Sequence, residues 1–177
     1  MHHNKLSYAI YKEIMNEIKK LIETLELQPH PEGGFYREMH RSITKIKDFY
    51  TLEDKSAYTT IYYLLSGRDF SAWHRIQSDE SWFYHLGCDL VVYYFDEHKT
   101  LKTMQIGLES MKLQATIPAN TWFAAKPLDE NEFCLVSCAV APGFLFTEFE
   151  IAKAQVLLEQ YGHSERAVQA IHALTRS

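Results

Sequence analysis

The segment from Gly67 to Gly87 constrains the fold more than any other part of the chain. His74 and Glu80 stand on either side of Gln77-Ser78-Asp79, three residues that favour a turn. In one straight strand, at ~3.3 Å per residue, the two would be about 20 Å apart and could not share a site. A hairpin instead places them on opposite arms, facing one interior. A histidine and a glutamate that converge on a pocket are either metal ligands or an acid–base pair.

The sequence around this segment has the pattern of an all-β protein. Short runs rich in branched and aromatic residues alternate with turn signals. These runs predict strands over residues 35–42, 59–65, 90–95, 101–106, 113–117 and 133–141. Several short strands at this spacing favour a sandwich or a barrel, and a double-sheet jelly roll is the natural closed arrangement.

Three helices are expected outside the β region. Apolar residues recur at three- and four-residue steps over 6–26, and helical patterns also cover 148–161 and 164–174. Ser164 is the expected N-cap of the last helix. The polar stretch 45–56 reads as a surface loop. The 177 residues fit one domain with its barrel core at about 30–148.

Five segments, in order, resemble one protein family. They are HPEGGFYRE from His30, TTIYYLLSG from Thr59, SAWHRIQSDESWFYHLG from Ser71, IPANTWFAA from Ile117 and VAPGFLFTEFE from Val140. Together they are similar to the DUF985, or cupin 5, family of RmlC-like cupins. The resemblance implies a mainly β, cupin-type double-stranded β-helix (a jelly-roll barrel) with one N-terminal and two C-terminal helices. It also implies a homodimer.

The resemblance breaks down at the metal ligands of cupins. The first cupin motif, G-x5-H-x-H-x3-4-E-x6-G, is matched at both glycines, at His74 and at Glu80, with one extra residue after the first glycine. Ile76 replaces its second histidine, and Phe123 replaces the histidine of the second motif. Because two of the four usual ligands are missing, no cofactor is expected. A weakly bound divalent metal, held by His74 and Glu80, is the one exception left open.

Three functions remain open from the sequence. The first is a metal-independent epimerase or isomerase in which His74 is the base, Glu80 orients it, and Tyr84 or Tyr62 supplies the acid. The second is a non-catalytic ligand-binding or sensory cupin, in which His74 and Glu80 satisfy each other as a buried pair. The third, weaker alternative is a metal-dependent cupin enzyme.

The expected ligand is a small polar or sugar-like molecule. Strand alternation puts Trp82 on the face of Glu80 and Ile76 on the face of His74, and Phe123 is expected beside them. A mostly apolar pocket with few polar groups is typical of small-molecule sites. Arg37 either reaches this pocket and grips an anionic group or forms a surface ion pair.

Charge and cysteine content limit the partners and the compartment. The net charge of −5 argues against nucleic acid as the main partner, and no apolar run approaches the ~20 residues of a spanning helix. Cys134 and Cys138 are about 13 Å apart on a strand, too far for a disulfide. With Cys88 they make an odd, irregularly spaced set, so all three are expected to be reduced, in a cytoplasmic protein without membrane contact.

Overall fold

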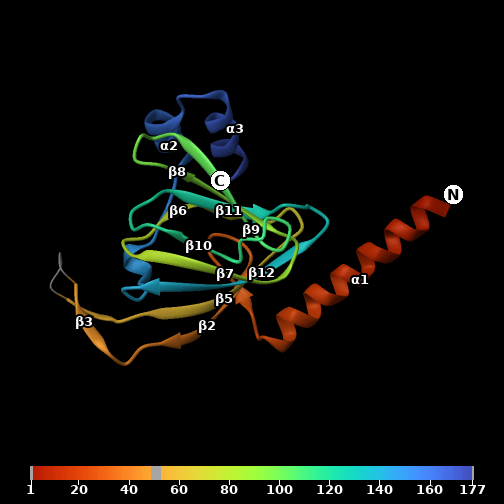
Figure 1. Cartoon of the computed structure of the whole chain (residues 1–177), viewed down its shortest axis with the longest axis horizontal. Coiled ribbons are helices and arrows are strands. Elements are labelled where there is room, and N and C mark those ends of the chain that lie inside the picture. Colours follow the sequence, from red (N-terminus) through yellow and green to blue (C-terminus); the bar gives the residue numbers. More distant parts are fainter. Residues whose placement is uncertain (1, 49–52, 177) are drawn as a thin grey trace.

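Two antiparallel sheets form the body of the protein in the computed structural model, which describes residues 2–48 and 53–176 (Figure 1). The six-stranded sheet has the order β1 (Gln28–Pro29), β2 (Phe35–Arg41), β5 (Thr59–Ser66), β12 (Phe133–Ala141), β7 (Asp79–Gly87) and β10 (Gln114–Ile117). The five-stranded sheet has the order β13 (Glu150–Ile151), β6 (Ser71–Arg75), β11 (Phe123–Pro127), β8 (Leu90–Phe95) and β9 (Leu101–Ile106). This double-sheet arrangement confirms the predicted jelly-roll fold.

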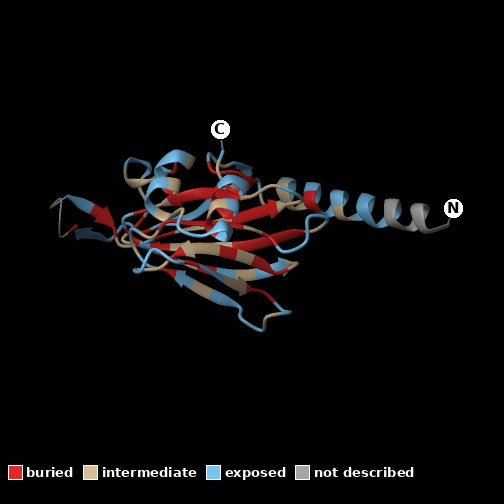
Figure 2. Cartoon of the chain, turned by 90° about the horizontal axis from the view of Figure 1, so that it is seen from above, coloured by how far each residue is buried: buried red, intermediate tan, exposed pale blue. Residues whose placement is uncertain are grey.

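The main core lies between the two sheets. Tyr63 and Trp82 from the six-stranded sheet pack with Val92, Ile106 and Phe123 from the five-stranded sheet, and all five are buried. Figure 2 shows the buried residues concentrated in the strands. Since successive strand residues point to opposite faces, each strand also presents residues to the outside of the barrel.

Helices cover the outer faces of both sheets. α2 (Ala154–Tyr161) and α3 (Glu165–Ala173) pack over the five-stranded sheet through a second cluster that includes Trp73, Leu157 and Ile171. Ser164 caps α3 as predicted, because its side chain accepts a hydrogen bond from the Ala167 N–H.

The N-terminal helix packs against the barrel through one end only. α1 (His2–Thr24) lies close to its predicted range, and Ile18 contacts Leu64 and Leu135 on the six-stranded sheet. The other end of α1 projects away from the barrel (Figure 1). Exposed side chains on that part include Ile10 and Met15.

The predicted hairpin between His74 and Glu80 is wrong in its pairing. β6 and β7 belong to different sheets, and the turn between them crosses from one sheet to the other. β6 pairs instead with β11 and β13, and β7 pairs with β12 and β10. The crossing still turns His74 and Glu80 toward one interior, because each side chain faces inward from its own sheet.

Three further segments differ from the prediction. The expected loop 45–56 contains the paired strands β3 (Lys45–Lys47) and β4 (Asp54–Ser56), while positions 49–52 lie outside the described residues. The helix expected over 148–161 begins only at Ala154, after a 3-10 turn η1 (Phe146–Glu148) and β13, whose pairing with β6 overrides the helical pattern. β11 was not predicted, because its residues FAAKP lack a β-rich pattern.

Candidate functional site

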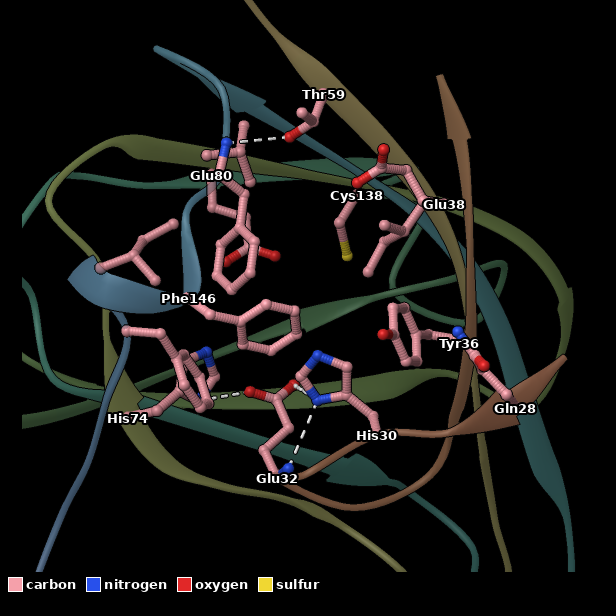
Figure 3. Close-up of a pocket in the computed structure, with 15 residues that line it drawn as sticks. Gln28, His30, Glu32, Tyr36, Glu38, Thr59, His74, Glu80, Cys138 and Phe146 are labelled. Atoms are coloured by element: carbon pink, nitrogen blue, oxygen red, sulfur yellow. Dashed lines mark hydrogen bonds and ion pairs between the residues drawn. The ribbon is translucent and has the colours of Figure 1, made fainter. Parts of the chain in front are cut away.

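A cavity of about 100 Å³ lies inside the barrel (Figure 3). Strands of both sheets and the segment that follows β12 form its walls. The described residues that line it are Gln28, His30, Glu32, Tyr36, Glu38, Thr59, Ile61, His74, Ile76, Glu80, Cys138, Val140, Phe144, Phe146 and Phe149. Apolar walls with a few convergent polar groups are what small-molecule sites present.

His74 is held in one tautomer by its neighbours. Its Nδ1 lies 2.7 Å from the carbonyl oxygen of Ala72 and 3.1 Å from Glu32 Oε2. Both oxygens accept hydrogen bonds, so Nδ1 must carry the hydrogen. In the neutral ring the lone pair is therefore on Nε2. A carboxylate that fixes a histidine in this way prepares the other ring nitrogen to act as a base.

Glu32 is the buried carboxylate that orients His74. Its Oε1 accepts a hydrogen bond of 2.9 Å from the Ser71 hydroxyl, and only 5% of the residue is exposed. The loop that carries it is fixed by backbone contacts: the Ala72 N–H and Arg176 Nε both donate to the carbonyl oxygen of Glu32, at 2.9 and 2.8 Å. The side chain is therefore held in place at both ends.

His30 lies beside Glu32, and its ring is the tautomer opposite to that of the neutral His74 ring. Its Nδ1 accepts a hydrogen bond from the backbone N–H of Glu32 at 3.3 Å, so this nitrogen carries no hydrogen. Burial lowers the pKa of His30, Glu32 partly opposes that effect, and His74 adds to it. A neutral His30 with a hydrogen on Nε2 follows from both observations.

Glu80 is a buried carboxyl group with a raised pKa. It is 7% exposed, and burial raises its pKa to about 8, with a further upward contribution from the negative charge of Glu32. The Cys138 thiol and the Trp82 indole oppose this rise. The Trp82 N–H nevertheless lacks hydrogen-bond geometry toward any described residue. Figure 3 shows Glu80 and Cys138 across the pocket from His30, Glu32 and His74.

Three phenylalanines after β12 close another side of the pocket. Phe144 lies edge-on to Phe146, with ring centroids 4.9 Å apart, and Phe146 stacks against His30 at 6.4 Å. Phe149 reaches the His74 ring at 5.5 Å. The backbone N–H of Phe144 donates to Thr59 Oγ1 at 3.0 Å, which fixes the start of this segment. The aromatic segment covers the polar groups beneath it on this side.

The structure brings several predicted site residues together. His74, Glu80 and Ile76 line the cavity. Phe123 lies directly behind His74, with ring centroids 4.1 Å apart, and Trp82 packs edge-on against Phe123 at 6.1 Å. Phe123 and Trp82 therefore support the site from the core and are not among its lining residues.

Three other predicted residues lie outside the cavity. Arg37 extends to the end of α1, where Nη1 contacts Glu26 at 2.9 Å and the carbonyl oxygen of Leu25 at 3.2 Å. Tyr84 packs in the main core and donates to the carbonyl oxygen of Gly87. Tyr62 packs toward the cluster beneath α1. Arg37 and Tyr62 alternate with lining residues on β2 and β5 and so face away from the pocket, whereas Tyr84 faces the barrel interior further along β7 than Glu80.

The main residues that sequence reasoning missed are His30 and Glu32. Both lie in the HPEGG segment, directly before a pair of glycines. Gly33 and Gly34 adopt positive φ angles of 117° and 69°. The turn brings Glu32 under β6, more than thirty positions along the chain, a contact that no local pattern encodes. The sequence feature that could have indicated this part of the site is a histidine and a glutamate two residues apart, directly before a glycine turn.

The residues present do not fit the metal site of cupins. Ile76 and Phe123 stand where two imidazole ligands belong, and Phe123 fills the space next to His74. Across residues 2–48 and 53–176, no group of three or more His, Cys, Asp or Glu side chains is arranged to hold a metal ion. A metal site normally needs at least three protein ligands.

The double-sheet barrel with a polar interior cluster defines a cupin. The family model described as "Cupin superfamily (DUF985)" matches residues 19–152. The chain therefore belongs to the DUF985 family of the cupin superfamily, as its sequence segments indicated. No curated protein matches the sequence.

Solved structures agree with this assignment. The chain is similar to a hypothetical protein from Leishmania major, with 31% identity and a TM-score of 0.80 over 90% of this chain and 98% of that one. It is similar to protein SO0799 from Shewanella oneidensis, with 33% identity and a TM-score of 0.78 over 89% and 96%. Oxalate decarboxylase from Bacillus subtilis shares the fold alone, at 12% identity and a TM-score of 0.52 over 80% of this chain and 35% of that one.

Proposed function

We propose that the protein binds a small polar molecule in its barrel and isomerises it by metal-independent acid–base chemistry. His74 is the base, Glu32 orients it, and Glu80 is the acid. The observation that carries this proposal is the placement of an oriented imidazole and a buried carboxyl group of raised pKa around one cavity. The neutral His74 ring has its lone pair on Nε2, and burial raises the pKa of Glu80 to about 8. Titratable groups whose surroundings give them opposite protonation states are the usual acid and base of such sites.

The proposed reaction moves protons only. His74 Nε2 takes a proton from a carbon next to a carbonyl group, so a C–H bond breaks and an N–H bond forms. Glu80 gives its proton to the resulting anion, and a new C–H or O–H bond forms. The product is an isomer of the substrate, and no oxidant or reductant is needed. Proton exchange with water then restores both groups.

The test is hydrogen exchange into a bound ligand. Ligands are first found by thermal shift with free sugars and other small polar compounds, and each ligand is then incubated with protein in D2O and followed by NMR. We expect deuterium at one carbon, and a rate about 10²–10⁴-fold lower in His74→Gln. His85→Gln, an exposed position on β7, is the matched control and keeps the rate. Binding without exchange by the native protein would instead support a non-catalytic, sensory cupin.

Metal analysis separates the remaining alternative. The donor set leads us to expect far less than one transition metal per chain in protein purified without a His-tag. One metal per chain, lost in His74→Gln and needed for exchange, would favour the metal-dependent cupin enzyme.

A homodimer remains part of the proposal. Phe83 and Leu86 of β7 are 36% and 42% exposed, and Ile10 on the projecting part of α1 is 50% exposed. Apolar side chains of this size are typical of contacts between subunits. Sedimentation velocity is expected to give the mass of two chains, and a monomer at micromolar concentration would refute it.

The cytoplasmic location also remains a prediction. Cys88, Cys134 and Cys138 are all free, which fits a reducing compartment. Among the described residues, no helix is long and apolar enough to cross a membrane. Fractionation of cells with an antibody against the protein tests the location directly.

A further inference from the structure

We propose that the substrate is an uncharged polyhydroxyl compound and that the pocket rejects relatives that carry a phosphate or carboxylate group. This inference rests on the proposed function, since it takes the cavity around His74 and Glu80 as the substrate site. It concerns the charge of the substrate, which the acid–base chemistry alone does not fix.

The first observation is that the pocket offers no permanent cation. None of its 15 described lining residues is a lysine or an arginine, whereas Glu32, Glu38 and Glu80 are all present. An anionic group placed here would lose its water without gaining a positive partner, which is costly in a buried site.

Basic side chains on the surrounding elements are already paired with other groups. Arg41 pairs with both oxygens of Glu38, at 3.0 and 2.6 Å, and also donates to the carbonyl oxygen of Phe144. Lys55 is buried between Asp48 and Glu148, at 2.8 and 2.5 Å. Arg37, the cation that the sequence suggested, pairs with Glu26 on the outside. Each would have to break a charged contact to reach an anion.

The second observation is that the carboxyl groups are not free to pair with a cationic ligand. Glu38 is neutralised by Arg41. Glu80 keeps its proton, and Glu32 accepts hydrogen bonds from Ser71 and His74. An ammonium group also has donors only, so it cannot accept a hydrogen bond from His30 Nε2–H or from the Glu80 hydroxyl.

The third observation is that the polar groups include both donors and acceptors. His74 Nε2 accepts, whereas His30 Nε2–H and the protonated Glu80 donate. A hydroxyl group both donates and accepts, so several hydroxyls on one compact molecule match this set. Phe146 and Phe149 supply apolar walls for its carbon skeleton.

The experiment compares probes that share a carbon skeleton and differ in charge. Free aldoses and ketoses of four to six carbons, their alditols, phosphates, aldonates and amino derivatives are titrated into the protein at neutral pH by calorimetry. We expect at least one free sugar or alditol to bind. The phosphate and the aldonate of that compound should bind at least tenfold more weakly than the neutral compound. Its amino derivative should bind no more tightly than the neutral compound. A phosphate, aldonate or amino derivative that binds more tightly than its neutral parent overturns the inference.

A charge-insertion variant tests the electrostatic cause. Gln28 is exposed at the edge of the pocket, so Gln28→Arg adds a cation there without burying it. In this variant we expect the ratio of the Kd of the phosphate to the Kd of its neutral parent to be smaller than in the native protein by about tenfold or more. Gln114→Arg adds the same charge to β10 away from the pocket and should leave the ratio unchanged. Equal effects of both variants would contradict the proposal.

The charge inference and the proposed function are contradicted by different results. An anionic ligand that binds to the native protein but not to His74→Gln would overturn the charge inference and leave the proposed site intact. Failure of every probe to bind would count against both the inference and the proposed function.

Discussion

Glu80 is a buried carboxyl group that makes folding stability depend on pH. Its pKa of about 8 in the folded protein stands above the ordinary value of 4.5. Between these values the folded state holds a proton that the unfolded state has lost, so the free energy of unfolding falls as pH rises. The slope is at most about 1.4 kcal/mol per pH unit, and it ends near the folded pKa.

Substitution of Glu80 by glutamine should remove this slope. Gln does not titrate, so the stability of Glu80→Gln relative to the native protein is expected to rise steadily from acidic pH to about pH 8 and then stay constant. Urea unfolding at several pH values measures the difference. A difference that does not change with pH would show that Glu80 ionises normally.

Two buried tryptophans differ in one hydrogen bond. Trp73 Nε1 donates to the carbonyl oxygen of Ala170 at 3.0 Å, whereas Trp82 Nε1 has no partner among the described residues. Replacing each by phenylalanine removes similar volume, but only Trp73→Phe loses a hydrogen bond, after which the Ala170 carbonyl oxygen keeps only the Leu174 N–H. We expect Trp73→Phe to lower the free energy of unfolding by about 0.5–1.5 kcal/mol more than Trp82→Phe. Equal losses would mean that the Trp82 N–H is also bonded.

At the scale of single residues, the sequence pointed to site residues that stand in a recognisable local pattern. His74, Glu80 and Ile76 line one cavity, because they stand around a turn in strands with clear alternation. Glu32 was not recognised as the partner of His74, because their contact depends on the path of the chain between β1 and β6. Long-range pairings of this kind have no local pattern.

At the scale of elements, a buried ion cluster joins the β3–β4 hairpin to the aromatic segment. Lys55 is 2% exposed and pairs with Asp48 and with Glu148, the last residue of η1. Removing one partner of a buried pair leaves an uncompensated charge, so Lys55→Met should destabilise the protein by about 3–5 kcal/mol. Lys47→Met on the exposed β3 is the control, and it should change the free energy of unfolding by no more than about 0.5 kcal/mol. A similarly small loss of stability in both variants would contradict a stabilising role for the ion cluster around Lys55.

The strands were predicted better than the connections. β8, β9 and β12 have their predicted bounds because their apolar residues face a core on one or both sides. The β3–β4 pair and β13 were missed, since both are short and mostly exposed, so their pairing comes from neighbours and not from composition. The same segments position Phe146 and Phe149 at the pocket.

At the scale of the whole molecule, the last residues of the described chain hold the loop that carries Glu32. Arg176 Nε donates to the carbonyl oxygen of Glu32, and its Nη2 pairs with Asp69 and donates to the carbonyl oxygen of Phe70. Arg176→Ala should cost about 1–2 kcal/mol, because charge-assisted bonds at a partly exposed position are lost. Arg166→Ala, on the exposed side of α3, is the matched control and should cost less. Equal melting temperatures of the two variants would contradict this link.

The most direct test of the account is an NMR titration of the Glu80 side-chain carbon, assigned by comparison with Glu80→Gln. The acid–base site requires Glu80 to hold its proton opposite an unprotonated His74 Nε2. The account predicts an apparent pKa near 8 for this carboxyl group. An apparent pKa at the ordinary value of 4.5 would contradict it, because the pocket would then contain a carboxylate and no acid.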